Sequence, residues 1–157
     1  MATSAEQAIL AQLKIIRTKR ASTTGEQKWL KQHINEANLR RLLPDISVVG
    51  LHLLSALEAG PQTGIDLATT LGVTRGGITR AAKRLTSQGL IGSFQQPGDH
   101  KKIFYRLTPS GRKLAHYHDQ MHAARNHEAV SMLREHYSSE ELAVIQRFLL
   151  DLTGYED

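Results

Sequence analysis

The spacing of apolar residues across residues 63–107 predicts two short helices followed by a two-stranded ribbon. The first helix ends at Gly72, which can supply the positive φ that a tight turn needs. The second helix places Ile78, Ala82 and Leu85 on one buried face. Two helices joined by a tight turn and followed by a ribbon form a winged helix-turn-helix.

The ribbon is predicted from alternating residues on either side of a turn signal. Gly89 ends the helical pattern, residues 90–94 can form the first strand, and Pro97 and Gly98 mark the turn. Four polar residues are expected at the hairpin tip: Asp99, His100, Lys101 and Lys102. Asp99 either orients a neighbouring basic side chain or is an ordinary turn-forming residue.

The flanking segments repeat their apolar residues at helical spacing. The predicted helices span residues 5–20, 26–43, 46–57 and 109–136, with a last helix after residue 138. Residues 23–25 either interrupt the first two helices or lie in one bent helix. Ser138 and Glu141 can form a capping box for the last helix. Four of its residues are expected to face inward: Leu142, Ile145, Leu149 and Leu152.

These elements predict a mainly α fold with a small β-hairpin wing, in a single domain of 157 residues. Residues 46–108 form the winged helix-turn-helix, and the helices of residues 1–45 and 109–157 are expected to dimerise it. Apolar residues make up 40% of the chain, which is enough for a core without disulfides or structural metal. Cysteine is absent, which excludes a disulfide framework and thiolate metal ligands.

Positive charge is concentrated in residues 73–113, which carry nine Lys or Arg against the single Asp99. A basic helix of this kind fits the DNA major groove, about 12 Å wide, although a solvated basic face is the alternative. The residues expected to contact DNA are Thr74, Arg75, Gly76, Thr79, Arg80, Lys83, Arg84, Asp99, His100, Lys101 and Lys102. Gly76 and its neighbour Gly77 suggest either close approach of the backbone to DNA or a frayed first turn.

The N-terminus lacks the apolar core of a signal peptide, and no apolar run approaches the roughly 18 residues that span a bilayer. A cytoplasmic protein without membrane contact is therefore expected.

Four of the eight histidines lie between His116 and His127. At about 100° per residue, His118 and His122 face the same side as Leu114, while His116 and His127 point away. Two inward imidazoles one turn apart can hold one Zn²⁺. A packed or solvated histidine pair is the alternative.

Four segments, residues 67–74, 78–85, 89–91 and 99–111, together resemble the MarR family of transcriptional regulators. The most specific of them is residues 99–111, which resembles the family's wing and the entry to its fifth helix. The resemblance covers nearly the whole chain. It implies a homodimer that represses nearby genes and whose DNA binding responds to a ligand near the dimerisation helices.

Residues 144–149 and the wing residues 103–105 further resemble the zinc-responsive branch of the family, the AdcR and ZitR repressors. That resemblance implies a zinc site formed by His52, His118 and His122, with zinc acting as corepressor.

The branch completes this site with a Glu whose matching position here is Ile34, so His33 or Glu36 is expected to be the fourth ligand. His136, also inward, is a further substitute. A second zinc site of the branch is expected to be missing, because its matching positions include Arg40, Leu51 and Tyr117.

The sequence thus predicts a homodimeric repressor that binds an inverted-repeat operator in double-stranded DNA, with zinc as corepressor. The alternative is a regulator without a metal site that a small aromatic or anionic ligand releases from DNA. A metal-dependent hydrolase is disfavoured, because no carboxylate has the spacing of the His-Glu-x-x-His motif. No enzymatic activity is expected.

Overall fold

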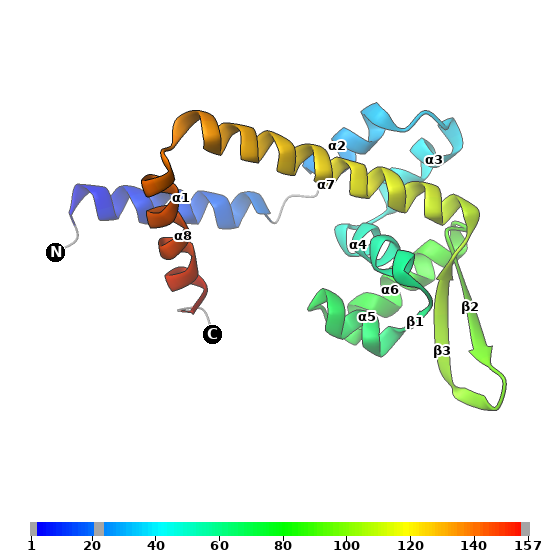
Figure 1. The fold of residues 1–157 in the computed structure, drawn as a ribbon. Coiled ribbons are helices and arrows are strands. Elements are labelled where there is room, and N and C mark those ends of the chain that lie inside the picture. Colours follow the sequence, from blue (N-terminus) through cyan, green and yellow to red (C-terminus); the bar gives the residue numbers. More distant parts are fainter. Residues whose placement is uncertain (1–2, 21–23, 155–157) are drawn as a thin grey trace. The chain divides into compact units, whose positions relative to one another are not determined.

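The structure is a computed structural model that describes residues 3–20 and 24–154. The chain divides into two compact units, Met1–Asp119 and Gln120–Asp157. The expected mainly helical fold with a small β wing is confirmed (Figure 1).

The first helix has nearly the predicted bounds, and shorter elements replace the helix expected over residues 26–43. In chain order these elements are α1 (Ser4–Arg20), α2 (Thr24–His33), α3 (Ala37–Leu42) and the 3₁₀ turn η1 (Leu43–Asp45). The prediction of a single helix over residues 26–43 was wrong. The chain leaves the helical conformation after α2, where Ile34 buries its side chain and Glu36 is extended (φ −76°, ψ 115°). Thr24 and Gly25 already belong to α2. Thr23 lies outside the described residues.

The buried helix expected over residues 46–57 is α4 (Val48–Ala56). Ser47 caps it, since its side chain accepts a hydrogen bond from the Gly50 amide at 3.1 Å. Leu51 and Leu54 are fully buried, which places α4 in the core of the first unit. The chain then continues into the 3₁₀ turn η2 (Leu57–Ala59).

The helix-turn-helix consists of α5 (Gly64–Leu71) and α6 (Arg75–Ser87). Gly72 joins them in the left-handed region (φ 62°), as expected. Thr74 caps α6 by accepting a hydrogen bond from the Gly77 amide at 3.1 Å. Ile78 and Leu85 are each 1% exposed, so α6 packs its apolar face into the core as predicted.

The wing is formed by β2 (Ile91–Gln96) and β3 (Asp99–Leu107), which pair antiparallel. A short strand, β1 (Gln62–Thr63), joins the other edge of β3, so the sheet has three strands where two were expected. Because Gln96 pairs with Asp99, only Pro97 and Gly98 remain for the turn. The four polar residues expected at the tip follow this turn directly, as the first residues of β3.

The long helix α7 (Pro109–His136) begins against the wing, with the bounds that the sequence predicted. Thr108 Oγ1 donates to the Gly89 carbonyl at 2.7 Å and accepts from the Gly111 amide at 3.1 Å. Gly111 lies so close to the Leu90 carbonyl that an added Cβ would overlap it. This contact fixes the start of α7 on the start of β2.

The second unit contains the remainder of α7 and the last helix, α8 (Ser139–Gly154). The expected capping box is present: the Ser138 amide donates to Glu141 Oε2 at 2.8 Å, and the Glu141 amide donates to Ser138 Oγ at 3.2 Å. None of the described α8 residues is buried, and Leu149 is 50% exposed. The stripe expected to face inward is therefore only partly covered in the single chain, with Leu142, Ile145 and Leu152 at intermediate exposure.

Candidate DNA-binding surface and metal site

The exposed side of α6 carries the residues expected to contact DNA. All of them are exposed, together with the cap: Thr74, Arg75, Gly76, Thr79, Arg80, Lys83 and Arg84. Thr79 Oγ1 donates to the Arg75 carbonyl at 2.9 Å, and the Thr74 side chain caps the helix. Both hydroxyls bond to the backbone of α6. The long charged side chains of this face therefore extend furthest into solvent.

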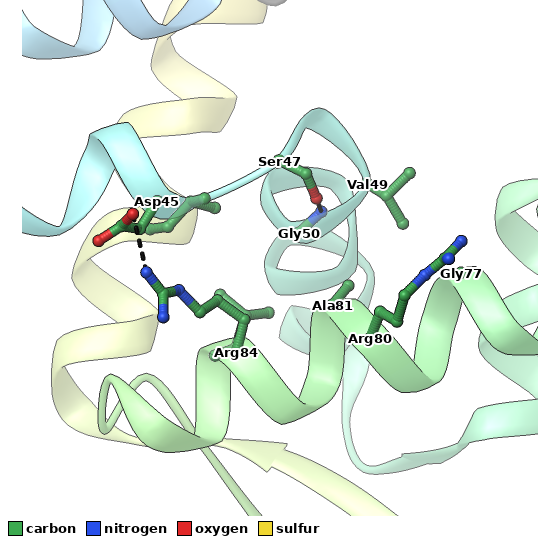
Figure 2. A pocket seen from close by; sticks show the side chains of 10 residues that line it. Asp45, Ser47, Val49, Gly50, Gly77, Arg80, Ala81 and Arg84 are labelled. Carbon is green, nitrogen blue, oxygen red and sulfur yellow. Dashed lines mark hydrogen bonds and ion pairs between the residues drawn. The ribbon is translucent and has the colours of Figure 1, made fainter.

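Arg84 and Arg80 line a cavity of about 380 Å³ between α4 and α6 (Figure 2). Arg84 Nη2 lies 2.7 Å from Asp45 Oδ1, and both side chains are about half exposed. An exposed ion pair of this kind contributes roughly 0–1 kcal/mol. Asp45 therefore ties α6 to η1 only weakly.

A second cavity of about 420 Å³ lies between α6 and the wing. Arg75 and Thr79 of α6 line it together with Lys101 and Lys102 of β3, and Asp66 of α5 is the acidic member. The structure thus brings four of the residues predicted for DNA contact into one groove. The other seven do not line it: Thr74, Gly76, Arg80, Lys83, Arg84, Asp99 and His100.

Asp99 is a turn-forming residue, which was one of the two alternatives. Its Oδ1 accepts hydrogen bonds from the backbone amides of Lys101 (3.0 Å) and Lys102 (3.2 Å). Across the hairpin, the Gln95 side-chain amide donates to the His100 carbonyl at 2.8 Å. These bonds order the backbone and leave the lysine side chains exposed.

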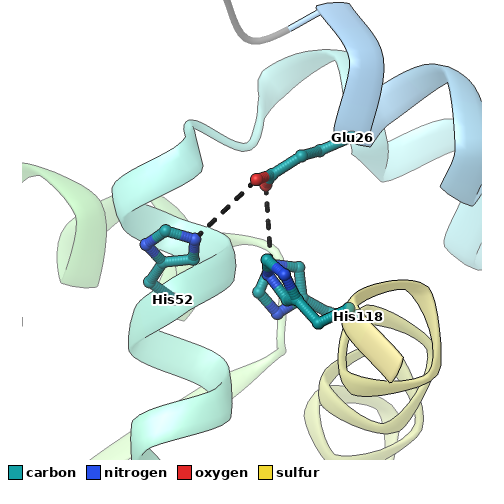
Figure 3. A group of neighbouring side chains, drawn as sticks. Glu26, His52 and His118 are labelled. Atoms are coloured by element: carbon teal, nitrogen blue, oxygen red, sulfur yellow. Dashed lines mark ion pairs between the residues drawn. The ribbon is translucent and has the colours of Figure 1, made fainter. Parts of the chain in front are cut away.

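Glu26, His52 and His118 converge from α2, α4 and α7 (Figure 3). His118 Nε2 lies 3.5 Å from Glu26 Oε2, and His52 Nε2 lies 3.9 Å from Glu26 Oε1. One ligand atom from each of these three residues lies within 4.8 Å of the others. His122 offers a fourth ligand atom to the same group. His122 follows His118 by one turn of α7, the spacing noted in the sequence.

The structure does not bring His33 or Glu36 to this cluster. His33 stacks on Trp29 and its Nδ1 lies 2.8 Å from the Trp29 carbonyl. Glu36 accepts a hydrogen bond from the Tyr117 hydroxyl at 3.0 Å and pairs with Lys113. His136, the last residue of α7, is also outside the group. His33 is the last residue of α2, about two turns beyond Glu26, and Glu36 lies in the break between α2 and α3.

Glu26 is the site residue that the sequence analysis missed. It precedes the fully buried Leu30 by one turn of α2, so both lie on the inward face of that helix. A carboxylate one turn from a buried leucine was the available signal. The resemblance to the zinc-responsive branch instead matched the carboxylate position to Ile34.

The cluster has the properties of a cation site. Glu26 Oε2 is buried and accepts no hydrogen bond within the described part of the chain. A buried carboxylate oxygen without a donor is costly, and a cation removes that cost. Two or three imidazole nitrogens with one carboxylate oxygen form a donor set that zinc accepts.

A pair of carboxyl groups, Glu58 and Asp119, lies beside this cluster. The hydrogen bond from Glu58 to Asp119, followed by burial and the charge of Asp119, raises the pKa of Glu58 to about 7. Ser55 Oγ donates to Asp119 Oδ1 at 2.8 Å, which links the pair to α4.

Because the pKa of Glu58 is raised, we expect the free energy of unfolding to depend on pH. The folded protein keeps this proton up to about pH 7, whereas the unfolded chain releases it near the ordinary value of 4.5. The stabilisation is therefore complete below about pH 4.5 and is lost as the pH rises through about 7. Glu58→Gln keeps a hydrogen at every pH, so its free energy of unfolding relative to wild type should rise between about pH 5 and pH 8 in urea titrations. Glu128→Gln is the exposed control, and a pH-independent difference for Glu58→Gln would contradict the shared proton.

Residues 47–103 match the family model of the MarR family. The transcriptional regulator AdcR of Streptococcus pneumoniae is 33% identical over 105 residues, which cover 66% of this chain and 70% of that protein. The chain belongs to the MarR family of transcriptional regulators. The MarR family consists of regulators that are not enzymes, in agreement with the sequence prediction.

Solved structures of MarR-family fold support the architecture. ZitR of Lactococcus lactis, described as a zinc-responsive MarR family member, has a TM-score of 0.71 at 24% identity, covering 98% of this chain and 96% of ZitR. FabT of Streptococcus pneumoniae, solved in complex with DNA, has a TM-score of 0.70 at 24% identity and covers 95% of each chain. Within residues 3–20 and 24–154, no helix has the length and hydrophobicity required to span a membrane.

Proposed function

We propose that this MarR-family regulator binds an inverted-repeat operator as a homodimer and that zinc strengthens its DNA binding as a corepressor. DNA binding is supported by the groove in which Arg75, Lys101 and Lys102 meet. Basic side chains there can neutralise phosphates on both sides of a recognition helix. FabT, which shares the fold, was solved with DNA.

Dimerisation is supported by the apolar residues that the terminal helices expose. In α1 these are Ile9, Leu10, Ile15 and Ile16, and in α8 they are Val144, Phe148, Leu149 and Leu150, all at least 40% exposed. Exposed apolar stripes on two helices are costly in water, and a second copy of the chain can cover both. A two-fold dimer then presents two recognition helices to an inverted repeat.

The observation that carries the zinc proposal is the buried Glu26 Oε2, which lacks a hydrogen-bond donor and lies 3.5 Å from His118 Nε2. His52, His118 and His122 are the nitrogen ligands of the proposed site, and Glu26 is its oxygen ligand. When bound, zinc would supply the positive charge that this group of acceptors lacks. ZitR, which shares the fold, is zinc-responsive.

Hydrogen bonds and an ion pair connect the proposed metal site to α6 through η1. Gln27, next to Glu26, donates from its side-chain amide to the carbonyls of Leu43 (3.1 Å) and Ile46 (2.9 Å). These carbonyls belong to the first residue of η1 and to the residue that follows it, and Asp45, the last residue of η1, pairs with Arg84. Ordering of α2 at the metal site would therefore favour one placement of η1 against α6, and the differential affinity for that arrangement would set the zinc effect.

The proposal is tested by DNA binding with and without zinc. Metal-stripped protein selects duplexes from a random pool, and fluorescence anisotropy then gives the affinity for the selected DNA. We expect zinc to raise that affinity by about 5–150-fold. Arg80→Ala should lower it by roughly 5–150-fold, because Arg80 is exposed on α6 and a base or phosphate contact contributes about 1–3 kcal/mol.

Arg134→Ala is the matched control, since Arg134 is an exposed arginine of α7 outside the expected DNA contacts. Equal DNA affinity with zinc and with chelator would reject the corepressor role. Unchanged affinity in Arg80→Ala would reject the assignment of the α6 face.

A cavity of about 670 Å³ favours a second candidate function. In it, a small anionic or aromatic ligand releases the regulator from DNA. Arg112, Lys113 and His116 line it together with apolar Leu107 and Pro109. The sign of the effect separates the two candidates, because such a ligand would lower DNA affinity whereas zinc would raise it.

A further inference from the structure

Ser55 contacts the His118 ring on the nitrogen that does not face Glu26. Ser55 Oγ lies 2.7 Å from His118 Nδ1, and the same hydroxyl donates to Asp119 Oδ1 at 2.8 Å. Ser55 and His52 are three residues apart on α4, so they lie on one face of that helix. A single hydroxyl thus joins a buried histidine to a carboxylate.

The direction of these hydrogen bonds determines which nitrogen of His118 carries the proton. A serine hydroxyl has one hydrogen, and here that hydrogen is donated to Asp119. Ser55 Oγ can then only accept at its short contact with Nδ1, so Nδ1 must be protonated. In the neutral ring the lone pair is consequently on Nε2, the nitrogen 3.5 Å from Glu26 Oε2.

We propose that Ser55 and Asp119 are positioning residues that hold His118 in the Nδ1–H tautomer, with the Nε2 lone pair directed into the metal site. This inference rests on the proposed zinc function. Neither residue is itself a candidate ligand. Histidine ligands commonly donate their second ring nitrogen to a carboxylate or another acceptor, which fixes ring orientation and raises ligand basicity. Here a serine stands between the ring and the carboxylate.

His118 is only 1% exposed, so its ring proton needs an acceptor inside the protein, and Ser55 Oγ supplies one. If Asp119 did not accept the serine hydrogen, Ser55 could donate to Nδ1. The ring proton would then move to Nε2, and the lone pair would point away from Glu26. Asp119 therefore acts on the site through the direction of one hydrogen bond.

The test compares Ser55→Ala and Ser55→Thr with wild type. Nitrogen-15 NMR of metal-stripped protein with labelled histidine, recorded at about pH 8 where free imidazole is neutral, reports the tautomer of His118. Wild type and Ser55→Thr should show the Nδ1–H form, and Ser55→Ala and Asp119→Ala should show an increased Nε2–H population. Zinc affinity, measured by competition with a chromophoric chelator, should fall about 10–100-fold in Ser55→Ala and recover in Ser55→Thr.

Ser93→Ala, an exposed serine of the wing, is the control for the substitution itself. Zinc binding by wild type with equal affinity in Ser55→Ala would overturn the positioning role and leave the zinc proposal standing. Weaker zinc binding with an unchanged tautomer would also overturn it, because the loss would then come from packing. Absence of zinc uptake by the wild-type protein would overturn both.

Discussion

Replacing His118 by alanine should weaken zinc binding by more than about 100-fold. Removal of an outer hydrogen-bond partner of a metal ligand typically costs 10–100-fold in affinity, and loss of the ligand itself should exceed that. His118 is also the most buried of the candidate ligands, and its Nε2 faces Glu26 Oε2 at 3.5 Å. Competition titration of metal-stripped protein against a chromophoric chelator measures the change.

Because loss of the buried His118 ring also leaves a cavity, Glu26→Gln provides a test that preserves side-chain size. Its amide removes the charge from a carboxylate that is 16% exposed, and zinc affinity should fall at least about tenfold. His127→Ala, an exposed histidine of the same helix, should retain wild-type affinity. Wild-type zinc affinity in both His118→Ala and Glu26→Gln would show that the metal, if bound, is held elsewhere.

The helix-turn-helix could be predicted because its signals are local. Gly72 adopts the positive φ that its position required, Thr74 caps the next helix, and Ile78 and Leu85 pack inward at helical spacing. Each of these features depends on residues within one or two turns of the chain. Pro109 likewise begins α7 at the predicted residue.

The missed features depend on contacts between distant segments. The two-residue strand β1 exists because Gln62 pairs with Tyr105, more than forty positions later in the sequence. Glu26 of α2 meets His52 of α4 and His118 of α7, which lie 26 and 92 positions later in the sequence. Helical periodicity could place His118 and His122 on one face, but the carboxylate that meets them comes from another helix.

The apolar stripe of α8 illustrates a different limit. Its spacing correctly predicted an amphipathic helix, yet none of its described residues is buried in the single chain. Periodicity shows which face of a helix must be covered, and it does not show whether the same chain or a second copy covers it.

Gly111→Ala should lower the free energy of unfolding by about 3 kcal/mol, the upper part of the range for overpacking. The added Cβ would overlap the carbonyl of Leu90, which is backbone and cannot rotate away. The same carbonyl accepts the Thr108 amide at 3.1 Å, so a shift of Leu90 would also disturb the start of α7. Urea unfolding followed by circular dichroism measures the loss, and a change below about 0.5 kcal/mol would contradict the close approach.

Gly76→Ala is the matched substitution with the opposite expectation. A Cβ at Gly76 meets nothing within 4 Å, and alanine favours the helical conformation of α6 by up to about 1 kcal/mol. The free protein should therefore become more stable, which would show that the loss in Gly111→Ala comes from its contact and not from the substitution type. DNA affinity then separates the two explanations of this glycine. If the α6 backbone approaches DNA closely, Gly76→Ala should bind the selected duplex more weakly despite its greater stability, whereas a frayed first turn predicts unchanged affinity.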